Sequence, residues 1–218
     1  MNAIRTSERG LSLVELLVGV AVALVVCAGA LKLLASHVES NRRVLLEARL
    51  HQDLRAAADL VARDLRRAGY WQSALKATVW PGQANPYRAL AASAALASYG
   101  YSRDAVENDT LDGNESFGLR LAAGALQMQD GSGGWQQMTD TGTVLVTSLS
   151  ITPATSVVSL GHLCTPACSS ADPACPALAI RRYEITIRGR AAADASVTRE
   201  VRESLRVRND DVFPAGCP

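Results

Sequence analysis

Residues 11–35 read LSLVELLVGVAVALVVCAGALKLLA and carry only two charged side chains, Glu15 and Lys32. With its apolar flanks, the uncharged part of this stretch reaches the roughly 20 residues that an α-helix needs to cross a bilayer. In hydrocarbon the backbone must satisfy its own hydrogen bonds, so we predict a membrane-spanning helix. A cleaved secretory signal fits less well, because its apolar core has about 7–15 residues and ends at a small-residue cleavage site.

Glu15 is the unexpected residue of this segment. A carboxylate inside an apolar helix costs about 2.5–3.5 kcal/mol even on a lenient insertion scale, so it is a functional candidate that needs a partner. Gly10 ends a short polar leader, MNAIRTSERG, directly before the apolar run. Cleavage after Gly10 would create an amino group on Leu11, and the amine of one copy would neutralise Glu15 of the next copy in a filament. This pairing would fix axial register, since a misaligned copy would leave a bare charge in apolar surroundings.

The leader and residues 9–18, RGLSLVELLV, resemble the signature of type IV prepilins. The resemblance implies that prepilin peptidase cleaves between Gly10 and Leu11, that Leu11 is N-methylated, and that Glu15 directs assembly. The first mature residue of that family is usually Phe, and Leu11 keeps the position apolar. A plain membrane anchor in which Glu15 is incidental is the alternative.

The arginines of the leader, Arg5 and Arg9, precede the helix. The positive-inside rule places them in the cytoplasm and everything after Lys32 outside. The resemblance implies a single-pass inner-membrane protein whose C-terminal domain lies in the periplasm and which is incorporated into the pilus.

Residues 36–68 contain neither Pro nor Gly, so the helix is expected to continue from Leu11 to Ala68, with Gly69 as its C-cap. Apolar residues at spacings of three and four form one stripe, which we expect the following strands to cover; a coiled-coil partner is the alternative. Residues 65–71, LRRAGYW, resemble a stretch of PilW-type minor pilins. The stripe consists of Leu50, Leu54, Ala57, Val61, Leu65 and Ala68.

The remaining sequence alternates short apolar pieces with Gly, Asp, Asn and Ser clusters, which predicts an antiparallel β domain. The expected fold is therefore α+β: a long N-terminal helix, half membrane-spanning and half amphipathic, packed on a C-terminal antiparallel sheet, which the resemblance makes a pilin fold. We expect a leader (1–10), an assembly helix (11–35), an amphipathic half (36–69) and an external domain (70–218). Strands are predicted at 117–121 and 125–129, paired across a turn at 122–124, and at 135–138. A further strand is predicted at 143–151, with Leu145, Leu149 and Ile151 on one face. The last two predicted strands, 180–188 and 197–207, are expected to form a hairpin.

Cysteine placement supports export. Cys27 lies inside the apolar helix, and Cys164, Cys168, Cys175 and Cys217 fall in the external part. An even number in an oxidising compartment predicts two disulfides with three possible connectivities. A zinc site that adds His162 to the first three external cysteines is the alternative, although their spacing is not that of paired C-x-x-C motifs.

No catalytic motif stands out: G-x-S-x-G, H-E-x-x-H and a P-loop are all absent from the sequence. We therefore expect no enzyme activity, no cofactor and no metal. Residues 102–115 are rich in oxygen side chains, but Leu119 stands where a twelve-residue calcium loop requires Glu, so a solvated surface loop is favoured over calcium. The chain has 22 basic and 21 acidic residues, a balance that argues against a nucleic-acid partner.

The resemblance implies a minor pilin that primes pilus assembly, at the filament tip. The expected partners are other minor and major pilins, prepilin peptidase, the inner-membrane assembly machinery and membrane lipid. A J-type pseudopilin of a type II secretion system shares the N-terminal features and is the nearest alternative. An exported enzyme or ligand-binding domain on a plain signal anchor is the alternative from another class.

Overall fold

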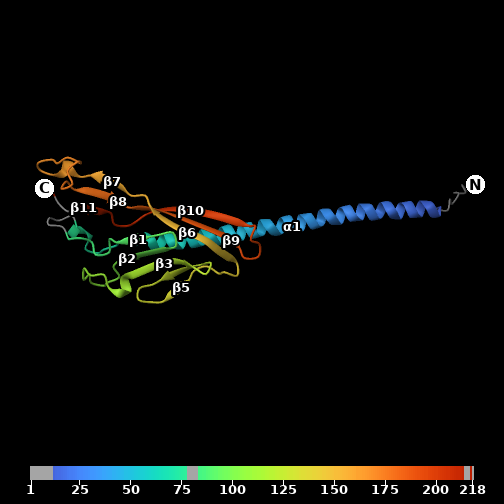
Figure 1. Cartoon of the computed structure of the whole chain (residues 1–218), viewed down its shortest axis with the longest axis horizontal. Coiled ribbons are helices and arrows are strands. Elements are labelled where there is room, and N and C mark those ends of the chain that lie inside the picture. Colours follow the sequence, from blue (N-terminus) through green and yellow to red (C-terminus); the bar gives the residue numbers. More distant parts are fainter. Residues whose placement is uncertain (1–11, 78–82, 214–216, 218) are drawn as a thin grey trace, which may run out of the picture. The chain divides into compact units, whose positions relative to one another are not determined.

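A computed structural model describes residues 12–77, 83–213 and 217 and shows one long helix followed by antiparallel strands, which confirms the α+β class (Figure 1). The chain divides into two compact units, whose border falls within the helix between Leu45 and Leu46. The elements are α1 (Leu13–Leu65), β1 (Leu90–Ala92), β2 (Leu96–Gly100), β3 (Ser116–Ala122), β4 (Ala125–Gln129), β5 (Trp135–Gln137), β6 (Val144–Pro153), β7 (Ser156–Ser159), β8 (Ala177–Ile180), β9 (Arg182–Ala191), β10 (Thr198–Arg206) and β11 (Asp211–Phe213), with short 3₁₀ turns at Ala74–Ala77, Gly113–Glu115 and Gly161–Leu163.

The first unit consists of the N-terminal part of α1. Every described residue up to Leu45 is exposed, although the part of the segment up to Ala35 is apolar on all sides. Its most apolar window has a mean hydropathy of 2.5, and none of that window is buried within the protein. By length and composition this helix is a candidate membrane span, as the sequence predicts.

The second unit begins with the rest of α1, whose apolar stripe is buried as predicted. Leu54, Val61 and Leu65 are each 0% exposed, and Ala58 and Ala62 join them because the small side chains let the strands approach closely. The strands that follow cover the stripe, as expected.

The helix ends at Leu65, three residues earlier than predicted. Its last turn tightens, since the amides of Arg67 and Ala68 bond to carbonyls three residues back instead of four. Gly69 ends this helical turn, as predicted: its φ of +74° is left-handed, and its N–H donates to the Gly100 carbonyl at 2.8 Å.

Strands β1 to β5 form one antiparallel sheet in chain order. The β3–β4 hairpin matches the prediction and turns through Ala123 and Gly124, both at positive φ, the conformation that favours tight hairpin turns. Strands β1 and β2 were not predicted, because residues 90–98 are mostly Ala and Leu and lack β-branched side chains.

The C-terminal strands form two three-stranded antiparallel sheets, β10-β9-β6 and β11-β8-β7. The β9–β10 hairpin is as predicted. The strand predicted at 180–188 is confirmed as β9, which begins two residues later than predicted, at Arg182, because Ile180 is the last residue of β8. Between them, the guanidinium of Arg181 donates to the carbonyls of Arg88 and Asn209, which anchors the interruption.

Strand β6 also differs from the prediction. Its register to β9 shifts between Val146 and Ser148, which marks a β-bulge. Val144 and Val146 are therefore buried before the bulge, and Leu149 and Ile151 after it, while Leu145 is only partly buried. Placing Leu145 on the same face as Leu149 was wrong because strict alternation does not survive an inserted residue.

Candidate functional site

Glu15, the predicted assembly carboxylate, lies in the first turn of α1. The helix is established around it, since the N–H of Leu16 donates to the Ser12 carbonyl at 3.0 Å. Among the described residues, no side chain or backbone group forms a hydrogen bond or ion pair with the Glu15 carboxylate. The positive end of the helix dipole favours a negative charge here, by about 0.3–1 kcal/mol, but does not neutralise it.

The other predicted residues of this site, Gly10 and Leu11, lie outside the described residues. Cleavage after Gly10 and methylation of Leu11 therefore stay predictions. What the structure supplies is the surface that follows them, a helix whose large apolar side chains stand open all the way round, from Leu13 at 75% exposed to Leu34 at 61%. Such a surface is suited to a membrane or to neighbouring apolar helices.

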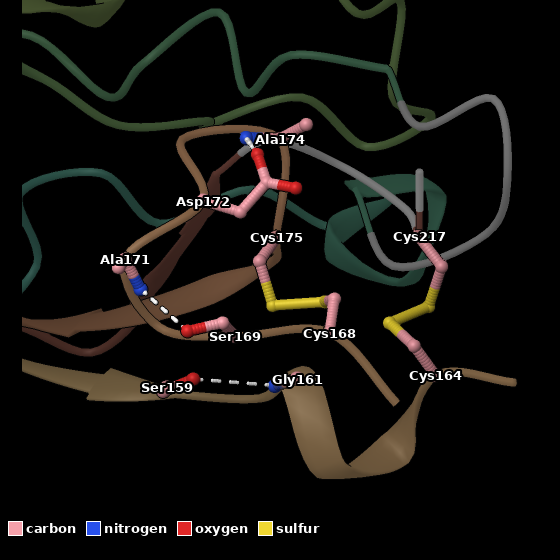
Figure 2. Close-up of a disulfide and its surroundings, with 10 residues drawn as sticks. All are labelled: Ser159, Gly161, Cys164, Cys168, Ser169, Ala171, Asp172, Ala174, Cys175 and Cys217. Atoms are coloured by element: carbon pink, nitrogen blue, oxygen red, sulfur yellow. Dashed lines mark hydrogen bonds between the residues drawn. A yellow bond between two sulfur atoms is a disulfide. The ribbon is translucent and has the colours of Figure 1, made fainter. Parts of the chain in front are cut away.

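The four cysteines of the second unit form two disulfides (Figure 2). Cys164 bonds to Cys217 and Cys168 to Cys175, with Cα–Cα distances of 5.6 and 5.8 Å, which selects one of the three connectivities that the sequence left open. Because all four sulfurs are paired, the alternative zinc site has no thiolate to offer.

The disulfide loop is closely packed on the chain before it. Asp172 fastens the turn, accepting from the amide of Ala174 at 2.9 Å (Figure 2). A Cβ at Gly161 would lie 2.2 Å from the Cys168 carbonyl oxygen and 2.5 Å from the Cys175 sulfur. Position 161 therefore admits only glycine, and the loop is held against the end of β7.

Residues 102–115 are mostly exposed, as the sequence predicted, but Glu115 at the end of this loop is 0% exposed. Its Oε1 accepts from the amide of Arg103 at 2.7 Å, and its Oε2 accepts from the Tyr87 hydroxyl at 3.0 Å and the Asp112 amide at 3.1 Å. Burial and the hydrogen bond to the Glu115 carboxylate raise the pKa of Tyr87. Glu115 thus fastens the two ends of the loop from inside.

Asp104 and Asp112 bring carboxylate oxygens within 4.8 Å of those of Glu115. The hydrogen bonds that Glu115 makes within the loop account for this grouping of carboxylates, which stabilises the loop itself. The signal that sequence reasoning missed is the spacing of Asp112 and Glu115, which is that of a capping box; both of its hydrogen bonds are present in the structure.

The two sets of predicted site residues lie in separate units: Glu15 in the first and the cysteines in the second. The apolar part of α1 is a candidate single-pass membrane anchor by length and composition. The family of prepilin peptidase-dependent protein B matches residues 43–207, and the prokaryotic N-terminal methylation motif matches residues 5–31. The chain therefore belongs to the prepilin peptidase-dependent protein B family. No curated protein and no solved structure matches it.

Proposed function

We propose that the chain is a PilW-type minor pilin that prepilin peptidase processes at the Gly10–Leu11 bond and that helps to prime pilus assembly at the filament tip. It acts before assembly as an inner-membrane protein with a periplasmic C-terminal domain, and its partners are other minor and major pilins and the inner-membrane assembly machinery. The observation that supports this most is Glu15, a carboxylate without a described partner, inside an exposed apolar helix within the matched methylation motif.

The proposed mechanism consists of packing and register, without catalysis. Taking the Glu15 carboxylate into an apolar filament interior is costly unless a positive charge accompanies it. The amino group of Leu11 on a neighbouring subunit supplies that charge, and only one axial alignment brings the two together. The membrane helix thereby selects its position in the assembly, and the external unit is carried to the tip.

A J-type pseudopilin of a type II secretion system would use the same N-terminal features. The residues of the second unit distinguish the two through their partners: co-purification from the native host with pilus subunits supports the minor pilin, and co-purification with secretion-system subunits supports the pseudopilin. The 65–71 segment, LRRAGYW, favours the first.

Co-expression with a prepilin peptidase tests the proposal. We expect mass spectrometry to find the chain shortened by its first ten residues, with one methyl group on the amine of Leu11. Gly10→Val is the matched control, because a branched side chain at the cleavage position should leave the leader attached. If the native chain kept an intact, unmethylated N-terminus in the presence of an active peptidase, the proposed pilin function would be excluded. An exported domain on a plain anchor would then be favoured.

A further inference from the structure

A groove runs along α1 within the second unit, between the helix and the outer strand β5. Its volume of about 320 Å³ is near the lower limit for ligand sites in proteins. Its floor is apolar and consists of Leu60, Met128 and Met138. Leu60 is 45% exposed, although its helix neighbours Ala57 and Val61 are buried. The chain therefore leaves apolar surface uncovered at this point.

The rim of the groove is basic at the end nearer the C-terminus of α1. Arg63 and Arg67 line this end together with Asp64. Asp64 already accepts a hydrogen bond from the Tyr99 hydroxyl and lies 3.9 Å from a guanidinium nitrogen of Arg67. Arg63 is exposed, and no described residue forms an ion pair or a hydrogen bond with its guanidinium. One positive charge is thus left without a partner beside the apolar floor.

The hollow that continues this groove toward the N-terminus of α1 has the opposite charge. It shares Leu60 and Met138 with the groove, and Asp53 and Asp140 line it. A carboxylate on an occupant of the shared floor is therefore attracted toward Arg63 and repelled from the other end. Methionines at the floor favour an aromatic ring, because a thioether makes favourable contacts with ring edges. The groove thus suits an aromatic group with a carboxylate about 5–6 Å further along, the spacing of Leu60 and Arg63 on the helix.

The same chain presents this combination of groups on β11. Phe213 is 44% exposed, and it is the one exposed aromatic side chain in the part of the chain that the structure describes. Asp211 stands two residues before it, on the same face of the strand and about 6–7 Å away. Their partners on β8 are Ala177 and Ala179, so both larger side chains stand above the sheet surface. The Asp211 carboxylate pairs with no described residue.

Phe213 does not fill the groove of its own chain. Pairing with β8 fixes β11 within the second unit, and β11 and β5 lie well apart in Figure 1. An apolar groove with an unpaired arginine and an exposed phenylalanine with an unpaired carboxylate are therefore complementary features at separate places on one molecule. Contact between them requires two copies of the chain.

We propose that a second copy of this chain inserts Phe213 into the groove. The ring lies between Met128 and Met138, and Asp211 of the inserted strand pairs with Arg63. The contact joins two different surfaces of the chain, so it can continue from copy to copy. One aromatic side chain buries only about 150–250 Å², so the contact is weak and acts between copies that are already held close together. This inference goes beyond the minor-pilin role and does not depend on it.

Methionine methyl signals test this contact directly. The chain has three methionines, at positions 1, 128 and 138, so two of the ¹³C-methyl signals of a labelled chain report on the groove. The labelled acceptor carries Phe213→Ala, which removes its own inserting ring, and unlabelled native chain is added as the donor in detergent. We expect the signals of Met128 and Met138 to shift with donor concentration, because an aromatic ring displaces the resonances of nearby methyl groups.

Two donor variants make this measurement specific. With Phe213→Ala in the donor as well, the apparent affinity should fall about tenfold or more. Leu163→Ala is the matched control, because it removes an apolar side chain that is 69% exposed but lies outside β11, and this donor should act as the native one does. Equal shifts with the Phe213→Ala donor, or no shift with the native donor, would overturn the proposal.

Charge reversal tests the ion pair separately. Arg63→Glu in the acceptor and Asp211→Arg in the donor should each weaken binding about two- to fivefold, the range of an exposed ion pair. The combination should recover most of the loss, because the reversed charges attract each other. Arg55→Glu, at an exposed position of the same helix outside the groove, should leave binding unchanged. Losses that simply add in the combination would show that the two side chains do not meet, and the proposed pairing would be wrong.

A photo-reactive amino acid at position 60 in the native host identifies the occupant, with one at Val106, which is 84% exposed on a loop, as the control. Adducts specific to position 60 that map to residues 209–213 of a second copy support the proposal. Adducts only to other proteins, or none beyond those at Val106, would overturn it.

Discussion

Helix α1 is a single element with two different surroundings. From Leu13 to Leu45 every residue is exposed, including valines and leucines that are 51–75% accessible. In the second half, from Leu46 to Leu65, three leucines of the same helix are exposed by only 0 or 1%, because the strands of their own chain cover them: Leu50, Leu54 and Leu65. The secondary structure is the same, so the difference lies in which apolar surface the chain itself can cover.

The comparison shows that the two halves obtain their stability from different sources. The second half has an apolar stripe and a polar face, so one sheet suffices to cover it. The part of the first half up to Ala35 is apolar all round, and no single sheet could cover it, so its natural surroundings are lipid or other helices. The two halves also treat acidic groups differently: Asp64 is contacted by Tyr99 and Arg67, whereas Glu15 has no described partner within the chain.

The largest effect is expected from Glu15→Ala. Removing the carboxylate should leave membrane insertion intact, because an apolar helix becomes more apolar. Incorporation into pili should fall at least about tenfold, since the neighbour's terminal charge is then left uncompensated, and breaking such a pair costs well over the ~1.4 kcal/mol that tenfold represents. The measurement is the amount of the chain in sheared pili relative to membranes.

Glu39→Ala is the matched control, an acidic residue on the same exposed helix beyond the apolar stretch. It should leave incorporation near the native level. If Glu15→Ala entered pili as readily as Glu39→Ala, the register mechanism would be wrong, and the first half of α1 would be an anchor only.

A second, smaller effect separates the halves by stability. Leu54→Ala removes a side chain that is 0% exposed and should lower the free energy of unfolding of the second unit by about 2–5 kcal/mol. Leu33→Ala, at a position 65% exposed, should change it by less than about 0.5 kcal/mol. Chemical unfolding followed by tryptophan fluorescence reports on the second unit alone, because all three tryptophans follow residue 70.

Similar losses at both positions would mean that the first half of α1 packs against the second unit, and the division at Leu45/Leu46 would have to be abandoned. A loss only at Leu54 would strengthen it.

The sequence predicted what depends on periodicity and composition. The apolar stretch, the buried stripe from Leu50 to Leu65, the stop at Gly69 and the β9–β10 hairpin all follow from spacing between neighbours along the chain. The disulfides were expected from the parity of the cysteine count, but their connectivity was not, because it depends on where residues 164 and 217 meet in space.

The predictions failed where a distant group intervenes. The break at Arg181 exists because its guanidinium reaches the carbonyls of Arg88 and Asn209, which no local pattern encodes. The bulge in β6 reverses an alternation that looked regular over Leu145 and Leu149. Glu115 was taken for a surface residue because its hydrogen bonds come partly from Tyr87, 28 residues earlier in the chain.

The smallest expected effect concerns Asp64, the carboxylate for which the second half of α1 does supply partners. The Tyr99 hydroxyl donates to its Oδ2, and Arg67, Arg103 and Asp130 are the charged groups that face it. Burial raises the pKa of Asp64 above its ordinary value of 3.8, and Arg67 opposes part of that rise. The folded protein therefore holds this proton to a higher pH than the unfolded chain does.

The sign of the pH dependence follows from that difference. Between the ordinary and the raised pKa, the folded state binds more protons, so the free energy of unfolding falls as pH rises through this window and is then constant. Asp64→Asn, which can still accept from Tyr99, should abolish this decline, and Asp59→Asn, at an exposed position of the same helix, should retain it. Unfolding by denaturant across the acidic range measures both. A decline that survives in Asp64→Asn would assign the pH dependence to another carboxyl group, and the prediction for Asp64 would be wrong.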